Sequence, residues 1–116
     1  MEHLRADLRA AGALDSRELE QLNGGERIVT AGLVTIRQQP QSAKGTVFLL
    51  MEDEFGFINV IVSKKMVEKY SEVVKFSTFV VVQGRFERDD GVRNVIGLKF
   101  SELKVKELVH ASRDFH

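Results

Sequence analysis

The chain has 116 residues, with 17 basic and 17 acidic side chains and no cysteine. This length suits one domain that buries its own core, and the lack of cysteine excludes disulfides and thiolate metal sites. A net charge of +0 excludes nucleic-acid binding through a general positive field. Any such binding must come from locally placed groups, and we expect it to be weak for the chain alone.

Metal, membrane and export signals are missing from the sequence. The histidines His3, His110 and His116 lie near the two ends and lack the spacing of metal ligands. No apolar run approaches the ~20 residues of a membrane span, and the N-terminus has no signal-peptide core. We therefore expect a cytoplasmic protein without a metal, a cofactor or membrane contact.

Residues 1–25 are predicted to form a lead-in of short helices. Leucines at helical spacing are followed by Gly12, which ends the first helix. Asp15 and Glu18 form the acid–x–x–Glu pattern of a capping box at the start of the second. We expect this lead-in to pack on one end of a barrel or to join an upstream domain.

Residues 26–100 are predicted to form five strands and one helix. The predicted strands are Glu26–Arg37, Thr46–Met51, Phe57–Val62, Thr78–Glu87 and Val92–Phe100. The helix, Ser63–Phe76, has one apolar face and begins at the N-cap Ser63. Gly32 inside the first strand predicts a bulge with positive φ. Beyond residue 100 we expect a short amphipathic segment and then a polar tail, together covering residues 101–116.

The turn between the second and third strands carries Glu52, Asp53 and Glu54. Clustered carboxylates can mark a metal or acid–base site, but their position favours a solvated hairpin loop that keeps an edge soluble. Gly56 is predicted to supply the positive φ of this short turn.

The order strand, strand, strand, helix, strand, strand is typical of the OB fold. This is a mainly β class, a five-stranded Greek-key barrel with a helix between strands three and four. The short N-terminal helices would be added to it. The alternative is another small barrel or sandwich with an incidental helix.

OB-folds bind ligands on strands two and three and on the loops joining strands one to two and four to five. An outward Phe48 would stack a nucleic-acid base there, and basic side chains would meet phosphates. The predicted binding residues are Arg37, Gln38, Gln39, Lys44, Phe48, Asn59, Arg88 and Arg93. Two alternatives stay open: Phe48 lies in the core if the alternation is shifted by one residue, and Arg37 is a solvated strand end.

Several segments, spread over nearly the whole chain, are specific in sequence. They are Ala31–Val34, Ile36–Pro40, Ala43–Gly45, Val47–Glu54, Asn59–Val62 and the ending Ser112–His116. Together they resemble the C-terminal OB domain of bacterial error-prone DNA polymerases, the C-family (DnaE-like) enzymes of damage-inducible mutagenesis. The chain departs from that family at Gln39, where a second basic residue is frequent, and at Ser63-Lys64, where Trp-Pro is usual.

The resemblance implies a piece without the catalytic carboxylates of the polymerase, and no catalytic constellation is present in the sequence. We therefore predict a non-catalytic module that binds single-stranded DNA beside an error-prone polymerase, in translesion synthesis, DNA replication and DNA repair. One alternative is a protein-interaction module that docks to other polymerase or mutasome subunits, because the net charge is zero. Another is an RNA-binding module, because the Arg-Gln and Lys-Gly-x-x-Phe elements also resemble the anticodon-binding domain of class II aminoacyl-tRNA synthetases.

Overall fold

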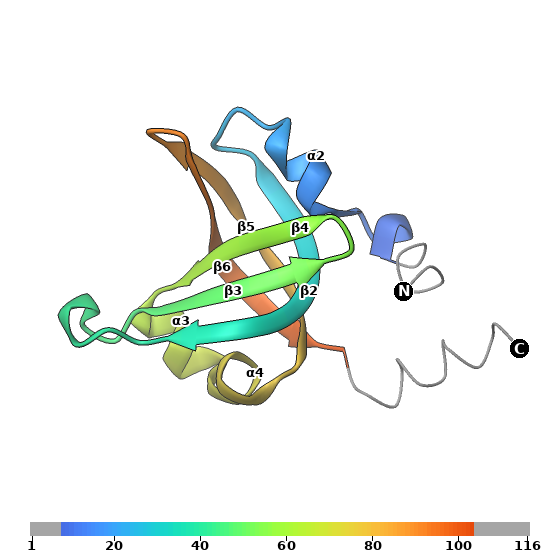
Figure 1. Cartoon of the computed structure of the whole chain (residues 1–116). Helices are drawn as coiled ribbons and strands as arrows, with labels where there is room; N and C mark the ends of the chain where they lie inside the picture. Colours follow the sequence, from blue (N-terminus) through green and yellow to red (C-terminus); the bar gives the residue numbers. More distant parts are fainter. Residues whose placement is uncertain (1–7, 104–116) are drawn as a thin grey trace, which may run out of the picture.

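The computed structural model describes residues 8–103. The elements are β1 (Ala13–Leu14), α2 (Ser16–Glu20), β2 (Arg27–Gln38), η1 (Gln41–Ala43), β3 (Val47–Asp53), β4 (Gly56–Val62), α3 (Lys64–Lys69), α4 (Ser71–Phe76), β5 (Phe79–Asp89) and β6 (Val92–Glu102). Strands β2 to β6 close into a barrel in the order β2-β3-β4-β6-β5, with β5 returning to β2 (Figure 1). This confirms the predicted OB topology, with a helical insertion between the third and fourth barrel strands.

Strand β2 closes the barrel because its two halves pair with different strands. The first half is antiparallel to β5 and the second half to β3. At the changeover, a Cβ on Gly32 would lie 2.9 Å from the carbonyl oxygen of Glu52. The predicted positive φ at Gly32 is wrong, and the bulge of β2 follows Val34 instead. Glycine is required here because two backbones approach closely.

The barrel interior is filled by alternate side chains of each strand. On β3, Val47, Leu49 and Met51 are buried, which leaves the residues between them on the outer face. Helices α3 and α4 replace the single predicted helix because the backbone changes direction at Tyr70, with φ −117° and ψ 37°. The predicted N-cap at Ser63 is confirmed, since its Oγ accepts the N–H of Met66 at 3.4 Å.

Helix α2 packs on one end of the barrel, as expected for the lead-in, and buries Leu19 in the main core. The predicted capping box is present: Asp15 accepts the N–H of Glu18 at 2.9 Å, and Glu18 accepts the N–H of Asp15 at 3.0 Å. Ahead of it, β1 is a strand that the sequence did not predict. It runs parallel to β2 on the side that β3 leaves open.

The turn between β3 and β4 differs from its predicted form. Gly56 has no positive φ; instead, Asp53 Oδ1 accepts the N–H groups of Phe55 and Gly56 at 2.9 and 3.0 Å. Asp53 is only 7% exposed, and its two oxygens accept the N–H and the hydroxyl of Ser16, both at 2.7 Å. The expected solvated loop is therefore wrong for Asp53, whose carboxylate links the hairpin to α2.

A small second core lies outside the barrel. Leu8, Ala13, Ala31 and Phe79 pack together there, with Leu103 against them. The amphipathic segment and polar tail predicted after residue 100 lie, from residue 104 on, outside the described residues. The division of the chain at residues 25 and 100 stays a prediction. Within residues 8–103 there is no helix with the length and apolar character needed to span a bilayer.

Candidate functional site

The outer face of β2, β3 and β4 carries a shallow groove of about 190 Å³. Its lining includes Ile36, Gln38, Phe48, Leu50, Asn59 and Ile61. These side chains share a face because each strand sends alternate residues outward. The groove combines an exposed aromatic ring, aliphatic side chains and three amides, and it contains no charged side chain in its lining.

Phe48 lies within this groove and is 37% exposed. It stands opposite Gln38 on β2 and Ile61 on β4. The predicted outward orientation of Phe48 is confirmed, and the alternative of a core position is wrong. The neighbouring Asn59 also points outward, opposite Leu50, so an amide lies within the same apolar surface.

Phe57 is a further exposed ring on this face, and sequence reasoning did not select it. It is 62% exposed and stands opposite Glu52 on β3. The signal was present, because the period of two that turns Asn59 outward also turns Phe57 outward. The position of Phe57 is four residues along the sheet from that of Phe48, or roughly 14 Å.

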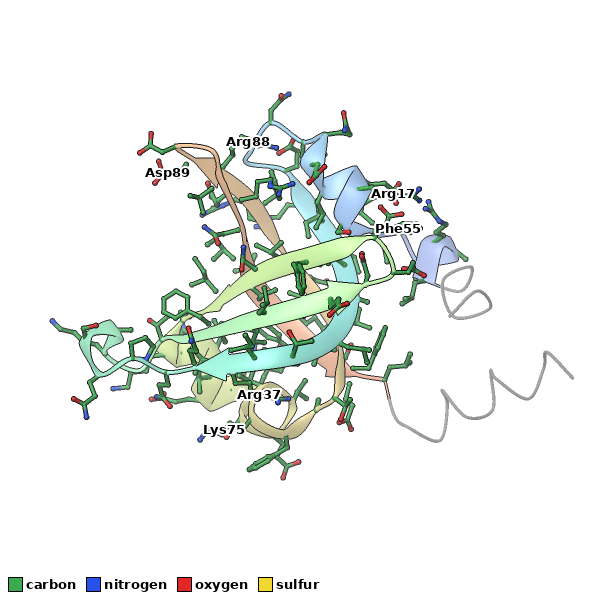
Figure 2. The ribbon with its side chains drawn as sticks, viewed as in Figure 1. Arg17, Arg37, Phe55, Lys75, Arg88 and Asp89 are labelled. Carbon is green, nitrogen blue, oxygen red and sulfur yellow. The ribbon has the colours of Figure 1, made fainter. Side chains whose placement is uncertain are left out.

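A smaller hollow adjoins the groove at Asn59 and Asn94, which line both. Phe57 and Arg93 border this hollow as well. Phe55 is also exposed, at 44%, but the guanidinium of Arg17 lies 3.4 Å from the centre of its ring and occupies one face of it. The groove and the adjoining hollow thus hold the rings of Phe48 and Phe57, while the ring of Phe55 contacts Arg17 of α2 (Figure 2).

Arg37 lies away from the groove. Its Nε donates to the carbonyl oxygen of Val74 at 2.8 Å, and its Nη2 donates to that of Ser77. Figure 2 shows Arg37 beside α4, at the end of the barrel that this helix closes. The guanidinium of Arg37 thus binds the C-terminal end of α4, and Arg37 is still an exposed residue near the end of β2, as the alternative of a solvated strand end expected.

Arg88 and Arg93 also contact α2. Arg88 Nη2 donates to the carbonyl oxygens of Glu20 and Leu22 at 2.9 and 3.0 Å. Arg93 forms an ion pair with the carboxylate of Glu20. The adjoining ends of β5 and β6 thus place both arginines against the end of α2, and this contact competes with any phosphate.

The remaining predicted residues lie in the loop between β2 and β3. Gln39 and Lys44 are exposed, and Lys44 has a φ of 51° at the end of η1. Of the predicted site, the groove itself brings together Gln38, Phe48 and Asn59, with Arg93 at its margin. Among residues 8–103 there is no group of acidic or histidine side chains that could hold a metal ion.

Sequence comparison finds relatives that are named error-prone DNA polymerase. The chain is 40% identical over 115 residues to the error-prone DNA polymerase of Pseudomonas fluorescens, which is 97% of this chain and 11% of the polymerase. It is 39% identical over 102 residues to the error-prone DNA polymerase of Caulobacter vibrioides, covering 88% of this chain and 9% of the relative. The resemblance predicted from the sequence is confirmed, over a small part of each relative's length. No family profile matches the chain.

Structural comparison finds barrels of the same fold. Asparaginyl-tRNA synthetase from Pyrococcus horikoshii superposes with a TM-score of 0.67 at 21% identity, over 79% of this chain and 23% of that one. The Stn1–Ten1 complex of S. pombe gives a TM-score of 0.54 at 17% identity, over 77% of this chain and 68% of that one. An OBody bound to hen egg-white lysozyme gives 0.57 at 15% identity, over 74% and 90%. At these identities the comparisons establish the OB fold.

Proposed function

We propose that this chain, which matches error-prone DNA polymerases over 97% of its length, is a non-catalytic module that binds single-stranded DNA. The observation that carries the proposal is the outward ring of Phe48 in an uncharged groove on the outer face of the barrel. An aromatic ring on an OB sheet is a platform for a base, and each stacked base contributes about 1–3 kcal/mol of binding free energy.

The groove supports stacking with limited sequence preference. Phe48 would take one base and Phe57 a second base further along the strand direction. The amides of Gln38 and Asn59, which line the groove, would donate to and accept from base edges. Because stacking accepts any base, this arrangement suits a template of arbitrary sequence better than a specific site.

The proposal extends to the longer error-prone DNA polymerases that the chain matches. Since the chain spans 11% of the Pseudomonas relative, we assign DNA synthesis to the rest of that length and template holding to this module. In that setting the module would keep the single-stranded template near the polymerase during translesion synthesis and repair in the cytoplasm. Other polymerase or mutasome subunits are the second class of partner.

A protein-interaction module is the second candidate function. It is favoured by the apolar side chains exposed on the groove face, because exposed apolar patches also mark protein interfaces. RNA is the second candidate ligand, since stacking does not distinguish the two sugars. Binding of oligo-rU compared with oligo-dT tests the ligand, and loss of all oligonucleotide binding at low salt would favour the protein partner.

The test of the proposed function is a matched pair of ring truncations. Phe48→Ala should lower oligo-dT affinity by about 1–3 kcal/mol through lost stacking. Phe76→Ala is the control, because Phe76 is 78% exposed on α4, away from the groove. Fluorescence anisotropy with labelled oligo-dT measures both. Equal affinities of the two variants, or undiminished binding by Phe48→Ala, would show that single-stranded DNA does not bind at this groove.

A further inference from the structure

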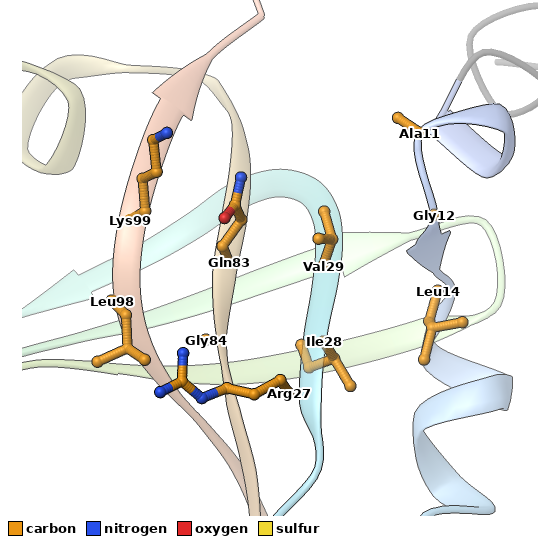
Figure 3. A pocket seen from close by; sticks show the side chains of 10 residues that line it. All are labelled: Ala11, Gly12, Leu14, Arg27, Ile28, Val29, Gln83, Gly84, Leu98 and Lys99. Atoms are coloured by element: carbon orange, nitrogen blue, oxygen red, sulfur yellow. The ribbon is translucent and has the colours of Figure 1, made fainter.

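We infer that a single strand stacked on Phe48 continues around the barrel to a second, cationic groove formed by β1, β2, β5 and β6. The inference rests on the proposed function and extends it from base stacking to phosphate binding. The second groove has a volume of about 590 Å³ and lies beyond the ligand face predicted from the sequence. Its lining includes Leu14, Arg27, Val29, Gln83, Leu98 and Lys99 (Figure 3).

The second groove concentrates positive charge. Arg27 on β2 stands directly opposite Arg85 on β5, and both are exposed. Like charges directly opposite one another destabilise a sheet. Arg85 is compensated by Glu87, whose Oε1 lies 2.5 Å from Arg85 Nε. Within residues 8–103, neither Arg27 nor Lys99 has an acidic side chain in ion-pair contact, so their charge is available to an anion.

The polar groups of this groove come from three adjacent strands. Gln83 on β5 stands opposite Val29 on β2 and Lys99 on β6. Figure 3 shows Arg27 extending from β2 over the neighbouring β5, on the face that carries Gln83 and Lys99. A guanidinium, an ammonium and an amide on one face provide donors that suit phosphate oxygens.

The two grooves are connected by the register of the barrel. Phe48 pairs with Ile61, Ile61 with Ile96, Ile96 with Arg85, and Arg85 with Arg27. All five side chains are at least partly exposed. A single row across the strands therefore leads from the stacking ring to the arginines. The row spans four steps between strands of about 4.8 Å each, or roughly 19 Å along the surface.

The occupant that fits this arrangement is the phosphodiester backbone of the strand bound at Phe48. The first groove stacks bases but has no charged side chain in its lining. Arg37, Arg88 and Arg93 are held by α4 and α2. Besides the exposed Lys44 in the loop before β3, a strand that follows this row meets available cations at Arg27, where the row ends, and at Lys99, on the neighbouring row that contains Val29 and Gln83. Phosphate contacts of this kind position the strand, while base contacts read it.

The experiment uses the whole chain with two probes, a dT tetramer and a dT dodecamer. Short and long probes separate the grooves because OB-folds occupy about 4–16 nucleotides. The test variant is the double substitution Arg27→Gln with Lys99→Gln. Its control, Lys65→Gln with Lys75→Gln, removes the same charge from exposed positions on α3 and α4. Anisotropy titrations over a range of salt concentrations give each affinity and its salt slope.

The inference expects the dodecamer to show the steeper salt slope on the unaltered chain. The test variant should lose about 1.4 units of that slope, or about 0.7 for each phosphate contact removed. It should bind the tetramer as the unaltered chain does, and the control should keep the slope for the dodecamer.

Three results would overturn the inference. In the first, the tetramer binds through Phe48, but the test and control variants change the salt slope of the dodecamer equally. The strand then does not reach the second groove, and the proposed function stands. If neither probe binds, the proposed function fails and the inference fails with it. If hexaglutamate binds the groove as tightly as the dodecamer and loses that binding in the test variant, the ligand is an acidic protein segment.

Discussion

Arg37 occupies the C-terminal end of α4, where the last carbonyl groups of a helix carry partial negative charge. Its planar group reaches the carbonyl oxygens of Val74 and Ser77 at once, which a lysine ammonium cannot match. Arg88 performs a similar task at α2 through Glu20 and Leu22. On this barrel, arginines near the expected ligand loops secure helices to strands.

Arg37→Ala should therefore lower stability and leave nucleic-acid binding unchanged. We expect a loss of about 1–2 kcal/mol in the free energy of unfolding, since two hydrogen bonds and a favourable interaction with the helix end are removed. Urea denaturation measures the loss, and oligo-dT titrations should give an unchanged salt slope. If the variant keeps its free energy of unfolding but its oligo-dT affinity depends less steeply on salt, Arg37 binds phosphate instead.

Asp53→Asn should lower the free energy of unfolding by about 2–3 kcal/mol. The buried carboxylate accepts hydrogen bonds from Ser16, Phe55 and Gly56. The NH₂ group of an asparagine would instead face some of these N–H and O–H groups, and two donors cannot form a hydrogen bond. The control is Glu52→Gln on the same strand, where the side chain is exposed and the change should stay within about 0.5 kcal/mol. Equal midpoints for both variants in urea would show that the Asp53 carboxylate does not link the hairpin to α2.

At the scale of elements, β2 is the strand on which the closed barrel depends. It is paired with β5 over one half and with β3 over the other, and the changeover occurs where Glu52 approaches Gly32. The bulge that follows turns the remainder of β2 toward the groove. The positions of Ile36 and Gln38 in the groove follow from this bend.

Gly32→Ala should destabilise the barrel by more than the ~1 kcal/mol typical of a point substitution. The added methyl group would lie 2.9 Å from the carbonyl oxygen of Glu52, so β2 and β3 would have to separate. Thermal unfolding followed by circular dichroism measures this effect. A melting temperature equal to that of the unaltered chain would show that the two strands have room for a side chain.

At this scale, a feature could be predicted from the sequence when neighbouring residues determine it, and could not when distant residues do. The alternation on β3 and β4 is a property of neighbouring residues, so Phe48 and Asn59 could be placed on the outer face. The partners of Arg37 and Arg88 could not be predicted, because they lie 37 or more positions away along the chain. The break at Tyr70 and the strand β1 likewise arise from packing on the finished barrel.

At the scale of the whole molecule, stability depends on carboxylates that the fold keeps ionised. Burial opposes the charge of Asp15, but the N–H of Glu18 and the side chain of Arg17 outweigh it and hold the pKa of Asp15 below its ordinary value. The N–H of Asn23 lowers the pKa of Glu26 in the same way. A lowered pKa in the folded state adds stability above the unfolded pKa, roughly pH 4, and that stability is lost as the pH falls through the folded value.

The melting temperature should accordingly fall as the pH is lowered below roughly 4. Asp15→Asn keeps an N-cap acceptor but loses its ion pairs with Arg9 and Arg17. We expect this variant to be less stable than the unaltered chain at pH 7 and to lose less stability on acidification. Parallel pH profiles for the two proteins would show that Asp15 contributes nothing to the acid response.

The divided pairing of β2 also governs the order in which the barrel can form. Its second half meets β3 after one short loop, so β2, β3 and β4 can assemble as soon as Val62 has been synthesised. Its first half must wait for β5, which follows both α3 and α4. Until Phe79 and the residues after it arrive, the side of that half that pairs with β5 is an open edge, while β1 can pair with its opposite side at Val29 and Thr30. Because the pairing of β2 with β5 joins residues far apart in the sequence, we expect it to form after the pairing of β2, β3 and β4, and we expect a chain that ends within α4 to aggregate more readily than the whole chain.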